Sequence, residues 1–277
     1  MPSLAGVVRA QQQAWAKAQD IPTDAAGYTL RLGDNLFVPL SDESVCDFKS
    51  GDGAELGDGS ARGKMQALHS SSALACNVFE YWRQRDPAPL ANALDLTRPI
   101  STIRFEQKFP TGLHGKAPNL DVVLGLQSGH RIAIESKFLE PYTSSHTQKF
   151  NPKYFEGAGQ LWADRGLPAC QELASSIDSG AITFRWLDAQ QLLKHALGLA
   201  KAGNDWCLWC IWYQVDGSAG VDHAAEAEQF AKLVAPDQIG FRAITYQSLF
   251  QTLLTTCSES DMPYLEYVGS RYFNKKD

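Results

Sequence analysis

The stretch PNLDVVLGLQSGHRIAIESKF, residues 118–138, decides which fold this sequence can adopt. It holds two runs with alternating apolar side chains, 120–126 and 131–138, separated by the short connection QSGH. Because successive side chains on a strand point to opposite faces, each run predicts a strand with one apolar face and one face that carries its ionisable groups. The short connection predicts that the two strands pair as an antiparallel hairpin.

The apolar positions also set the register of this hairpin. When the two apolar faces are matched across the connection, Asp121 lies opposite Glu135 or Lys137. Two carboxylates and one amine are therefore expected on one face. Carboxylates this close repel each other unless a cation lies between them, and oxygen ligands favour Mg²⁺ or Mn²⁺. Since the lysine adds a charge that can stabilise a pentavalent phosphate or help to deprotonate an attacking water, the pattern is typical of metal-assisted phosphodiester hydrolysis.

The rest of the chain predicts a mixed sheet flanked by helices. A helix is expected from Met65 to about Arg85, because apolar side chains recur there at steps of three and four residues. A first strand is expected over 103–109, ahead of the hairpin. The later elements are helices over 153–166, 187–200 and 224–234, a buried strand over 206–215, and a strand or strand-to-helix passage over 241–249. This order of elements belongs to the α/β class.

A glycine-rich stretch divides the chain. Residues 49–64, KSGDGAELGDGSARGK, show no apolar periodicity and are expected to form a loop or hinge. We therefore expect an N-terminal extension with this loop over residues 1–64 and one domain over residues 65–277.

Composition narrows the class of protein. A chain of 277 residues with 44% hydrophobic side chains can bury a substantial core, and its net charge of −6 argues against coating nucleic acid or membrane by bulk attraction. The N-terminus lacks the continuous apolar core of a secretory signal. The longest apolar run, 206–213, is far shorter than the roughly 20 residues that span a bilayer. We expect a soluble, cytoplasmic protein with no membrane partner and with reduced cysteines.

One stretch departs from the acidic average. Residues 101–153 carry seven basic and four acidic side chains, a net charge of +3. Because this stretch contains the hairpin, its basic side chains are candidates to line a path for phosphates. The candidates for this path are six of the seven, Lys108, Lys116, Arg131, Lys137, Lys149 and Lys153, together with His114, His130 and His146.

The hairpin resembles the PD-(D/E)XK nuclease superfamily, which has the restriction-endonuclease-like fold. The match consists of PNLD, residues 118–121, and ESK, residues 135–137, on the apolar strand IAIESKF. The family core runs α-βββ-α-β, which is also the order predicted for residues 65–215. Pro118 stands three residues before the aspartate instead of directly before it. This spacing makes the match to the first half of the motif weaker, but the three charged residues, Asp121, Glu135 and Lys137, are all present.

The resemblance implies a function for these residues. It implies a Mg²⁺- or Mn²⁺-dependent DNA endonuclease of the restriction, defence or repair type. Asp121 and Glu135 would then be metal ligands, the backbone carbonyl of Ser136 would complete the site, and Lys137 would be the catalytic lysine. Enzymes that cut both strands commonly act as dimers, so a homodimer is compatible with this function.

Three further residues are weaker candidates for the site. Many superfamily members add an acid from the first helix, and Glu80 is the candidate there, with an exposed helix glutamate as the alternative. Glu106 lies on the strand before the hairpin and either continues the active face or is an ordinary surface residue. Gln160 lies on the helix expected after the lysine strand, where some relatives use a glutamine near the phosphate; a capping or solvated role is the alternative.

Other functions compete with this interpretation. A protein can keep the nuclease fold without catalysis and bind nucleic acid or serve a structural role. A solvent-facing hairpin with a cross-strand Asp–Lys pair would fit an unrelated hydrolase or a small-molecule binder. Cys207 and Cys210 form a C-x-x-C pair without a second pair or a histidine cluster, so packing explains them better than zinc.

Overall fold

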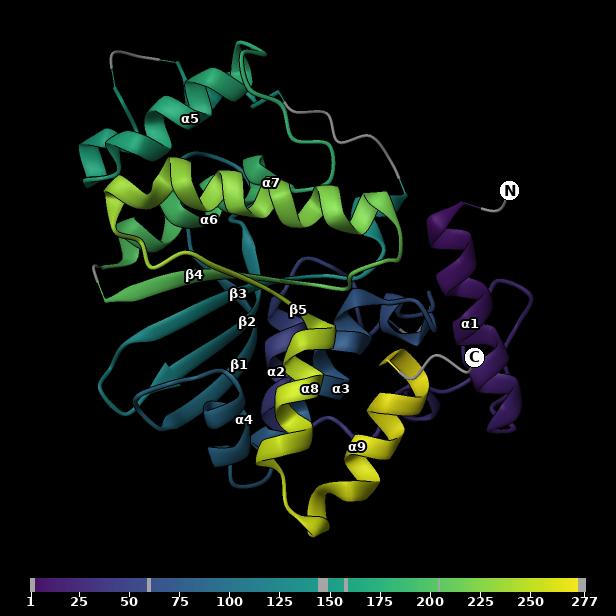
Figure 1. Ribbon diagram of the computed structural model, residues 1–277. Coiled ribbons are helices and arrows are strands. Elements are labelled where there is room, and N and C mark those ends of the chain that lie inside the picture. Colours follow the sequence, from purple (N-terminus) through teal and green to yellow (C-terminus); the bar gives the residue numbers. More distant parts are fainter. Residues whose placement is uncertain (1–2, 59–60, 144–148, 157–158, 204, 274–277) are drawn as a thin grey trace.

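The computed structural model describes residues 3–58, 61–143, 149–156, 159–203 and 205–273, and it contains one mixed five-stranded sheet (Figure 1). The strands follow the order β1-β2-β3-β4-β5 across the sheet, with the first three antiparallel and the last two added in parallel. Their bounds are β1 Ile100–Lys108, β2 Asn119–Leu126, β3 Arg131–Lys137, β4 Trp206–Trp212 and β5 Arg242–Thr245. The predicted mixed sheet flanked by helices is therefore confirmed.

The hairpin of β2 and β3 has the register that its apolar pattern predicts. Val122 pairs with Ile134, and Leu124 pairs with Ile132. One more step along this register places Asp121 opposite Glu135, one of the two expected partners. Apolar alternation thus sets the register, because a slip of one residue would turn every buried side chain of the strand to the opposite face.

Helices cover both faces of the sheet. In Figure 1, α5, α6 and α7 lie together on one face, and α2, α3 and α8 lie on the other. The bounds on the first face are α5 Pro168–Asp178, α6 Ala189–Ala202 and α7 Ser218–Val234. The other helices are α1 Leu4–Ala18, α2 Asp42–Ser50, α3 Ser71–Arg83, α4 Ala88–Ala93, α8 Tyr246–Thr256 and α9 Met262–Val268.

Each face of the sheet has its own hydrophobic core. Val122 and Ile134 belong to the core shared with α3, whereas Val123 and Ala133 belong to the core shared with α6. Because side chains alternate along a strand, Glu135 has the same orientation as Ala133 and faces α6. The ionisable face of the hairpin is therefore covered by a helix instead of facing open solvent.

The helix α3 is more deeply buried than its sequence pattern indicates. Ser70 caps its first turn by accepting a hydrogen bond from the backbone N–H of Ala73, 3.2 Å. The polar side chain of Asn77 accepts a hydrogen bond from the backbone N–H of Phe37, 2.8 Å. The N-terminal segment thus lies over the polar stripe of this helix.

One predicted helix is absent. Among the described residues of 153–166, only two short 3₁₀ turns form, at Pro152–Tyr154 and Ala163–Arg165. Glycines interrupt this stretch, and its aromatic side chains pack against one another and do not form a helical stripe. The later predictions fare better: α6 and α7 form near their expected positions, and β5 leads directly into α8.

The six cysteines of the chain are all free. Across the described ranges, the helices include none with the length and apolar character needed to cross a membrane.

Gly198 allows α6 to approach the chain that follows β1. A Cβ on Gly198 would lie 2.2 Å from the carbonyl oxygen of Phe109, a backbone atom. We expect Gly198→Ala to lower the free energy of unfolding by about 1–3 kcal/mol, because α6 must shift to relieve the clash. Urea unfolding measures this effect. Gly33→Ala is the control, since a Cβ there has open space; equal unfolding midpoints for the two variants would contradict the prediction.

Candidate active site

The structure brings Asp121, Glu135 and Lys137 together on the α6 side of the hairpin. The Nζ of Lys137 lies 2.7 Å from Oε1 of Glu135. The Oδ2 of Asp121 accepts a hydrogen bond from the backbone N–H of Ser136, 2.7 Å. The hydroxyl of Ser136 lies 2.6 Å from that of the buried Tyr246, which anchors this part of β3 to the start of α8. The three charged residues are thus held on a fixed piece of backbone.

These charges shift one another's protonation. Burial raises the pKa of Asp121 well above its usual range, and the negative charges of Glu135 and Glu106 raise it further. Burial also acts to raise the pKa of Glu135, but the positive charge of Lys137 and the contact with His195 outweigh it and lower that pKa to about 2. Burial acts to lower the pKa of Lys137, yet the two carboxylates raise it above its ordinary value. Asp121 is therefore the carboxyl group that gains most from a nearby cation.

Two residues of α6 complete this cluster, and the sequence reasoning missed both. Gln191 accepts a hydrogen bond from Nζ of Lys137, 2.6 Å. The Nε2 of His195 lies 2.8 Å from Oε2 of Glu135, and the histidine side chain is fully buried. These residues are four apart and so share one face of the helix. Their signal in the sequence is a polar pair at this spacing inside a helix whose other inward positions are apolar.

Glu106 adds a third carboxyl group on the neighbouring strand. It is 7% exposed and has φ +48°, an uncommon conformation for a residue with a side chain. Its Oε2 accepts a hydrogen bond from Nδ2 of Asn119, 2.9 Å. Burial raises the pKa of Glu106 to about 7, with Asn119 opposing and the charges of Glu55 and Glu135 adding to the rise. From the sequence, Glu106 is expected either to continue the active face or to be an ordinary surface residue. Its burial and its electrostatic coupling with Glu135 favour the first role.

The raised pKa of Glu106 predicts how stability varies with pH. The folded protein holds this proton up to about pH 7, whereas the unfolded chain releases it near the ordinary value of 4.5. Ionisation therefore disfavours folding, and the free energy of unfolding falls as pH rises from about 4.5 to 7. Glu106→Gln keeps the acceptor for Asn119 without the charge, so we expect it to be more stable than the parent by about 1–3 kcal/mol at pH 8 and nearly equal at pH 4.5. Urea unfolding at both pH values measures this; a gain of equal size at both would contradict it.

The other two weaker candidates lie outside this cluster. Glu80 is 1% exposed, and its carboxylate accepts hydrogen bonds from the backbone N–H of Ser41, 2.7 Å, and the hydroxyl of Ser44, 2.6 Å. It therefore ties the N-terminal segment to α3. Gln160 is exposed and lines a shallow surface hollow with residues of α5, including Gln171. No contact in the described ranges links either residue to Lys137.

The comparison with known families covers almost the whole chain. A family model described as "restriction endonuclease associating with ARP" matches residues 10–273. The chain belongs to this family. The match spans all five strands, the charged hairpin and α6. Neither a curated protein nor a solved structure matches the chain.

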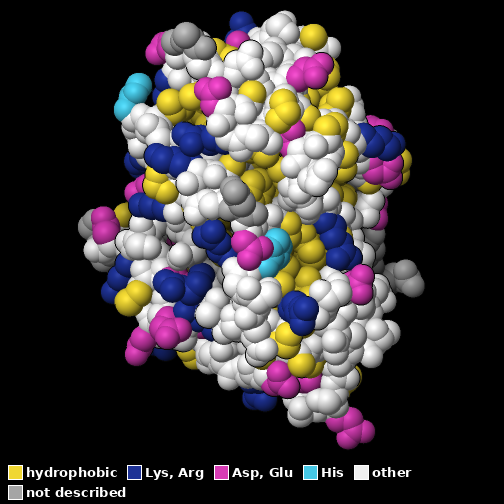
Figure 2. All heavy atoms as spheres, turned by 90° about the vertical axis from the view of Figure 1, so that its left-hand side faces the viewer, with side chains coloured by type: hydrophobic (Ala, Val, Ile, Leu, Met, Phe, Trp, Pro, Cys, Tyr) yellow, Lys and Arg dark blue, Asp and Glu magenta, His cyan; other side chains and the backbone are white. Residues whose placement is uncertain are grey.

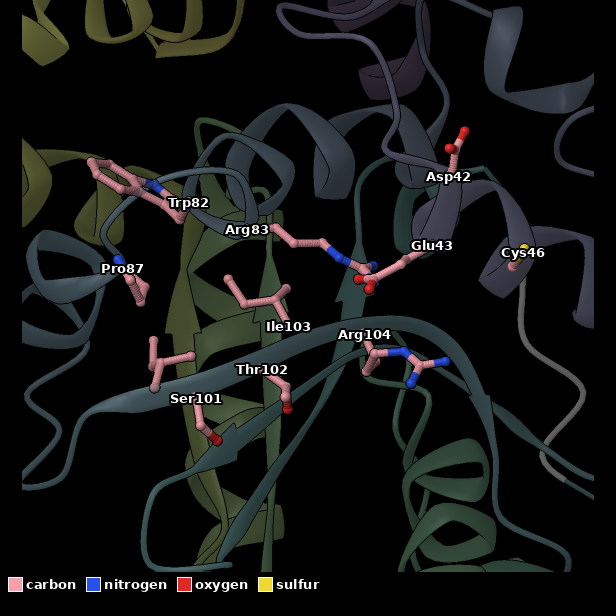
Figure 3. Close-up of a pocket in the computed structure, with 11 residues that line it drawn as sticks. Asp42, Glu43, Cys46, Trp82, Arg83, Pro87, Ser101, Thr102, Ile103 and Arg104 are labelled. Atoms are coloured by element: carbon pink, nitrogen blue, oxygen red, sulfur yellow. The ribbon is translucent and has the colours of Figure 1, made fainter.

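In this restriction-endonuclease family member, a separate hollow lies along the free edge of β1. It has a volume of about 630 Å³ and is lined by residues of α2, α3 and β1, but not by Asp121 or Lys137. Figure 3 shows Arg83 reaching toward Glu43 across this hollow, and their charged groups lie 2.7 Å apart. The buried Asp47 binds Arg83 and Arg104 behind them. These charges neutralise one another, so the hollow does not extend the active face.

Two of the basic side chains of residues 101–153 contact other residues of the chain. Lys108 pairs with Asp52, 3.2 Å, and the guanidinium of Arg131 lies 5.8 Å from the ring centroid of Phe109. His146 lies outside the described residues. Figure 2 shows Lys and Arg interspersed with Asp and Glu on the face it presents.

Proposed function

We propose that this chain is a Mg²⁺-dependent endonuclease that hydrolyses phosphodiester bonds of DNA, with a PD-(D/E)XK site on a restriction-endonuclease-like fold. One observation carries the proposal: Asp121, Glu135 and Lys137 meet on one face of the β2–β3 hairpin, with Lys137 2.7 Å from Glu135. Membership of a restriction-endonuclease family supports it. Of the restriction, defence and repair types, the family description favours restriction.

The donor atoms of the proposed ligands are oxygens, which suit a hard divalent cation. Asp121 and Glu135 supply carboxylate oxygens, and the backbone carbonyl of Ser136 is the proposed third ligand. Each carboxylate oxygen has two lone pairs, so the contacts of Glu135 with Lys137 and His195 leave acceptor capacity for an ion. Mg²⁺ commonly takes one or two carboxylates and keeps several waters, so a small ligand set suffices. Burial, and after it the negative charges of Glu135 and Glu106, raise the pKa of Asp121, which supports a cation beside this carboxyl group.

Each residue of the cluster has a role in the proposed reaction. When bound, Mg²⁺ polarises the phosphate and lowers the pKa of a water. Lys137, held by Gln191 and Glu135, places its positive charge where negative charge develops on the phosphate. The buried His195 lies 2.8 Å from the other carboxylate oxygen of Glu135, Oε2, and limits the space in which this carboxylate can move.

Binding of the metal gives the first test. Thermal unfolding of the full chain is measured with increasing Mn²⁺, and cleavage of plasmid DNA is measured with Mg²⁺ or Mn²⁺. A ligand that binds the folded state stabilises it by about 2.7 kcal/mol at one hundred times its Kd, so the melting temperature should rise with Mn²⁺. Asp121→Asn should abolish both the rise and the cleavage. Asp222→Asn, the same change at an exposed position of α7, should leave both intact.

A catalytically idle protein with the nuclease fold is the second candidate. Two observations favour it: Lys137 already occupies Oε1 of Glu135, and the described ranges contain no group of three His, Cys, Asp or Glu residues placed to hold a metal. This candidate would be supported if the chain binds DNA but shows neither a Mn²⁺-dependent rise in melting temperature nor cleavage. The endonuclease proposal fails on that result.

A further inference from the structure

The segment that follows β3 brings two lysines onto one aromatic side chain beside α6. The Nζ of Lys153 and the Nζ of Lys194 each lie 5.7 Å from the ring centroid of Tyr154. The Nζ of Lys194 also lies 5.8 Å from the ring centroid of Phe150. These are distances of cation–π contacts. Two positive charges therefore share one aromatic ring.

Neither lysine forms an ion pair with a carboxylate within the described part of the chain. The ion pairs of lysines there involve other residues, and the hydrogen-bond acceptors of this pair are neutral. Lys153 donates to the carbonyl oxygen of His114, 2.6 Å, and Lys194 donates to Oε1 of Gln190, 2.9 Å. Burial lowers the pKa of Lys194, with Asp188 opposing and the charge of Lys153 adding to the fall. Binding an anion would relieve this repulsion.

The aromatic surface under the lysines is rigid. The ring of Tyr154 stacks on that of Trp162 at a centroid distance of 5.8 Å and an angle of 24°. Trp162 is fully buried and donates its indole N–H to the carbonyl oxygen of Leu193, 2.8 Å. Leu193, which accepts this hydrogen bond, precedes Lys194 on α6. Because the surface is fixed to that helix, an arriving anion meets lysines that are already positioned.

This lysine pair lies close to the proposed active site. Lys194 follows Gln191 by three residues, so the two side chains are neighbours on the surface of α6, about one turn or ~5 Å apart along the axis. Gln191 accepts the hydrogen bond of Lys137. The charge of Asp188, at the start of α6, acts on both Lys137 and Lys194. The N-terminal end of α6 therefore lies close to both Lys137 and the lysine pair.

We propose that Lys153 and Lys194 form an anion site for a backbone phosphate of the nucleic-acid strand that crosses the active site. The inference rests on the proposed function and names a second contact of the same substrate. Ammonium groups act as point charges on phosphate oxygens and read no bases. The site therefore contributes affinity and positioning of the strand, without sequence preference.

The test measures binding in the absence of cleavage. Fluorescence anisotropy of a short labelled DNA duplex is followed in EDTA over a series of salt concentrations, with the full-length parent and with Lys153→Gln/Lys194→Gln. Each lost phosphate contact lowers the slope of log affinity against log salt by about 0.9, so we expect the slope to fall by about 2. Near ~0.1 M salt, the affinity should fall about 10- to 100-fold.

Matched variants separate this effect from net charge and folding. Lys17→Gln/Lys232→Gln removes the same charge from exposed positions on α1 and α7 and should keep the parent slope. Lys153→Arg/Lys194→Arg keeps both charges and should retain binding. The melting temperatures of all variants are compared. A glutamine pair that folds and binds with the affinity and slope of its control would overturn the proposal.

Further measurements distinguish inorganic phosphate from nucleic acid as the ligand, and they separate the anion-site proposal from the endonuclease proposal. If inorganic phosphate raises the melting temperature of the parent while duplex DNA, single-stranded DNA and RNA all fail to bind, the assignment to nucleic acid is wrong. If the glutamine pair loses DNA binding but the parent never cuts, the anion site stands and the endonuclease proposal fails. If the parent cuts with Mg²⁺ and the glutamine pair binds and cuts equally well, the anion site fails alone.

Discussion

Lys137→Ala is expected to lower the rate of DNA cleavage by about 10²- to 10⁴-fold, the range that one positioned catalytic group contributes. Its Nζ lies 2.7 Å from Oε1 of Glu135 and 2.6 Å from Oε1 of Gln191, so contacts with β3 and α6 fix its position. Single-turnover cleavage of a labelled duplex in Mg²⁺ measures the chemical step. Lys232→Ala is the control, because its side chain is 79% exposed on α7.

The same variant also changes stability, and the two effects can be separated. Removing Lys137 leaves Glu135 buried without its cation, which costs about 3 kcal/mol in comparable buried pairs. Replacing both members, as Lys137→Met with Glu135→Gln, removes the unpaired charge and should recover much of that stability. Activity should stay low in the double variant. Parent-like cleavage by folded Lys137→Ala would overturn the catalytic role of the lysine.

The hairpin could be predicted because its information is local. Alternating apolar side chains in β2 and β3 fix which face of each strand packs against α3, and the short turn fixes which residues meet. Convergence of Asp121 with Glu135 and Lys137 follows from these two constraints alone. Most of the order of the elements could be predicted for the same reason. The exception is the helix expected over 153–166, where only short 3₁₀ turns form.

The partners of that hairpin could not be predicted from local pattern. Gln191 and His195 lie more than fifty residues after Lys137 in the sequence, and they reach the site only because α6 packs across the sheet. Glu80 also shows that a local sequence pattern does not reveal contacts with distant segments. Its position on a polar stripe predicts exposure, yet Ser41 and the residues after it cover that stripe. Contacts between distant segments decide which polar side chains are buried.

The largest stability effect outside the active site is expected at Arg271. Arg271 is 3% exposed, and its guanidinium donates hydrogen bonds to Asn35, Gln12 and the carbonyl oxygen of Leu68. It also lies 4.6 Å from the ring centroid of Trp15. Figure 1 shows α1 near α9, and α1 contacts the turn Gly269–Phe273 that follows α9 and contains this arginine. One side chain therefore holds together three segments that are remote in sequence.

Arg271→Met is expected to lower the free energy of unfolding by about 3 kcal/mol, because methionine fills part of the space but leaves several buried acceptors without a donor. For a chain of this size the melting temperature should fall by about 6–12 °C. Calorimetry and urea unfolding measure the change. Arg185→Met is the matched control: Arg185 is exposed and lies over Trp186, so its loss should cost less than about 0.5 kcal/mol. Equal melting temperatures for the two variants would show that the contacts of Arg271 do not hold the termini together.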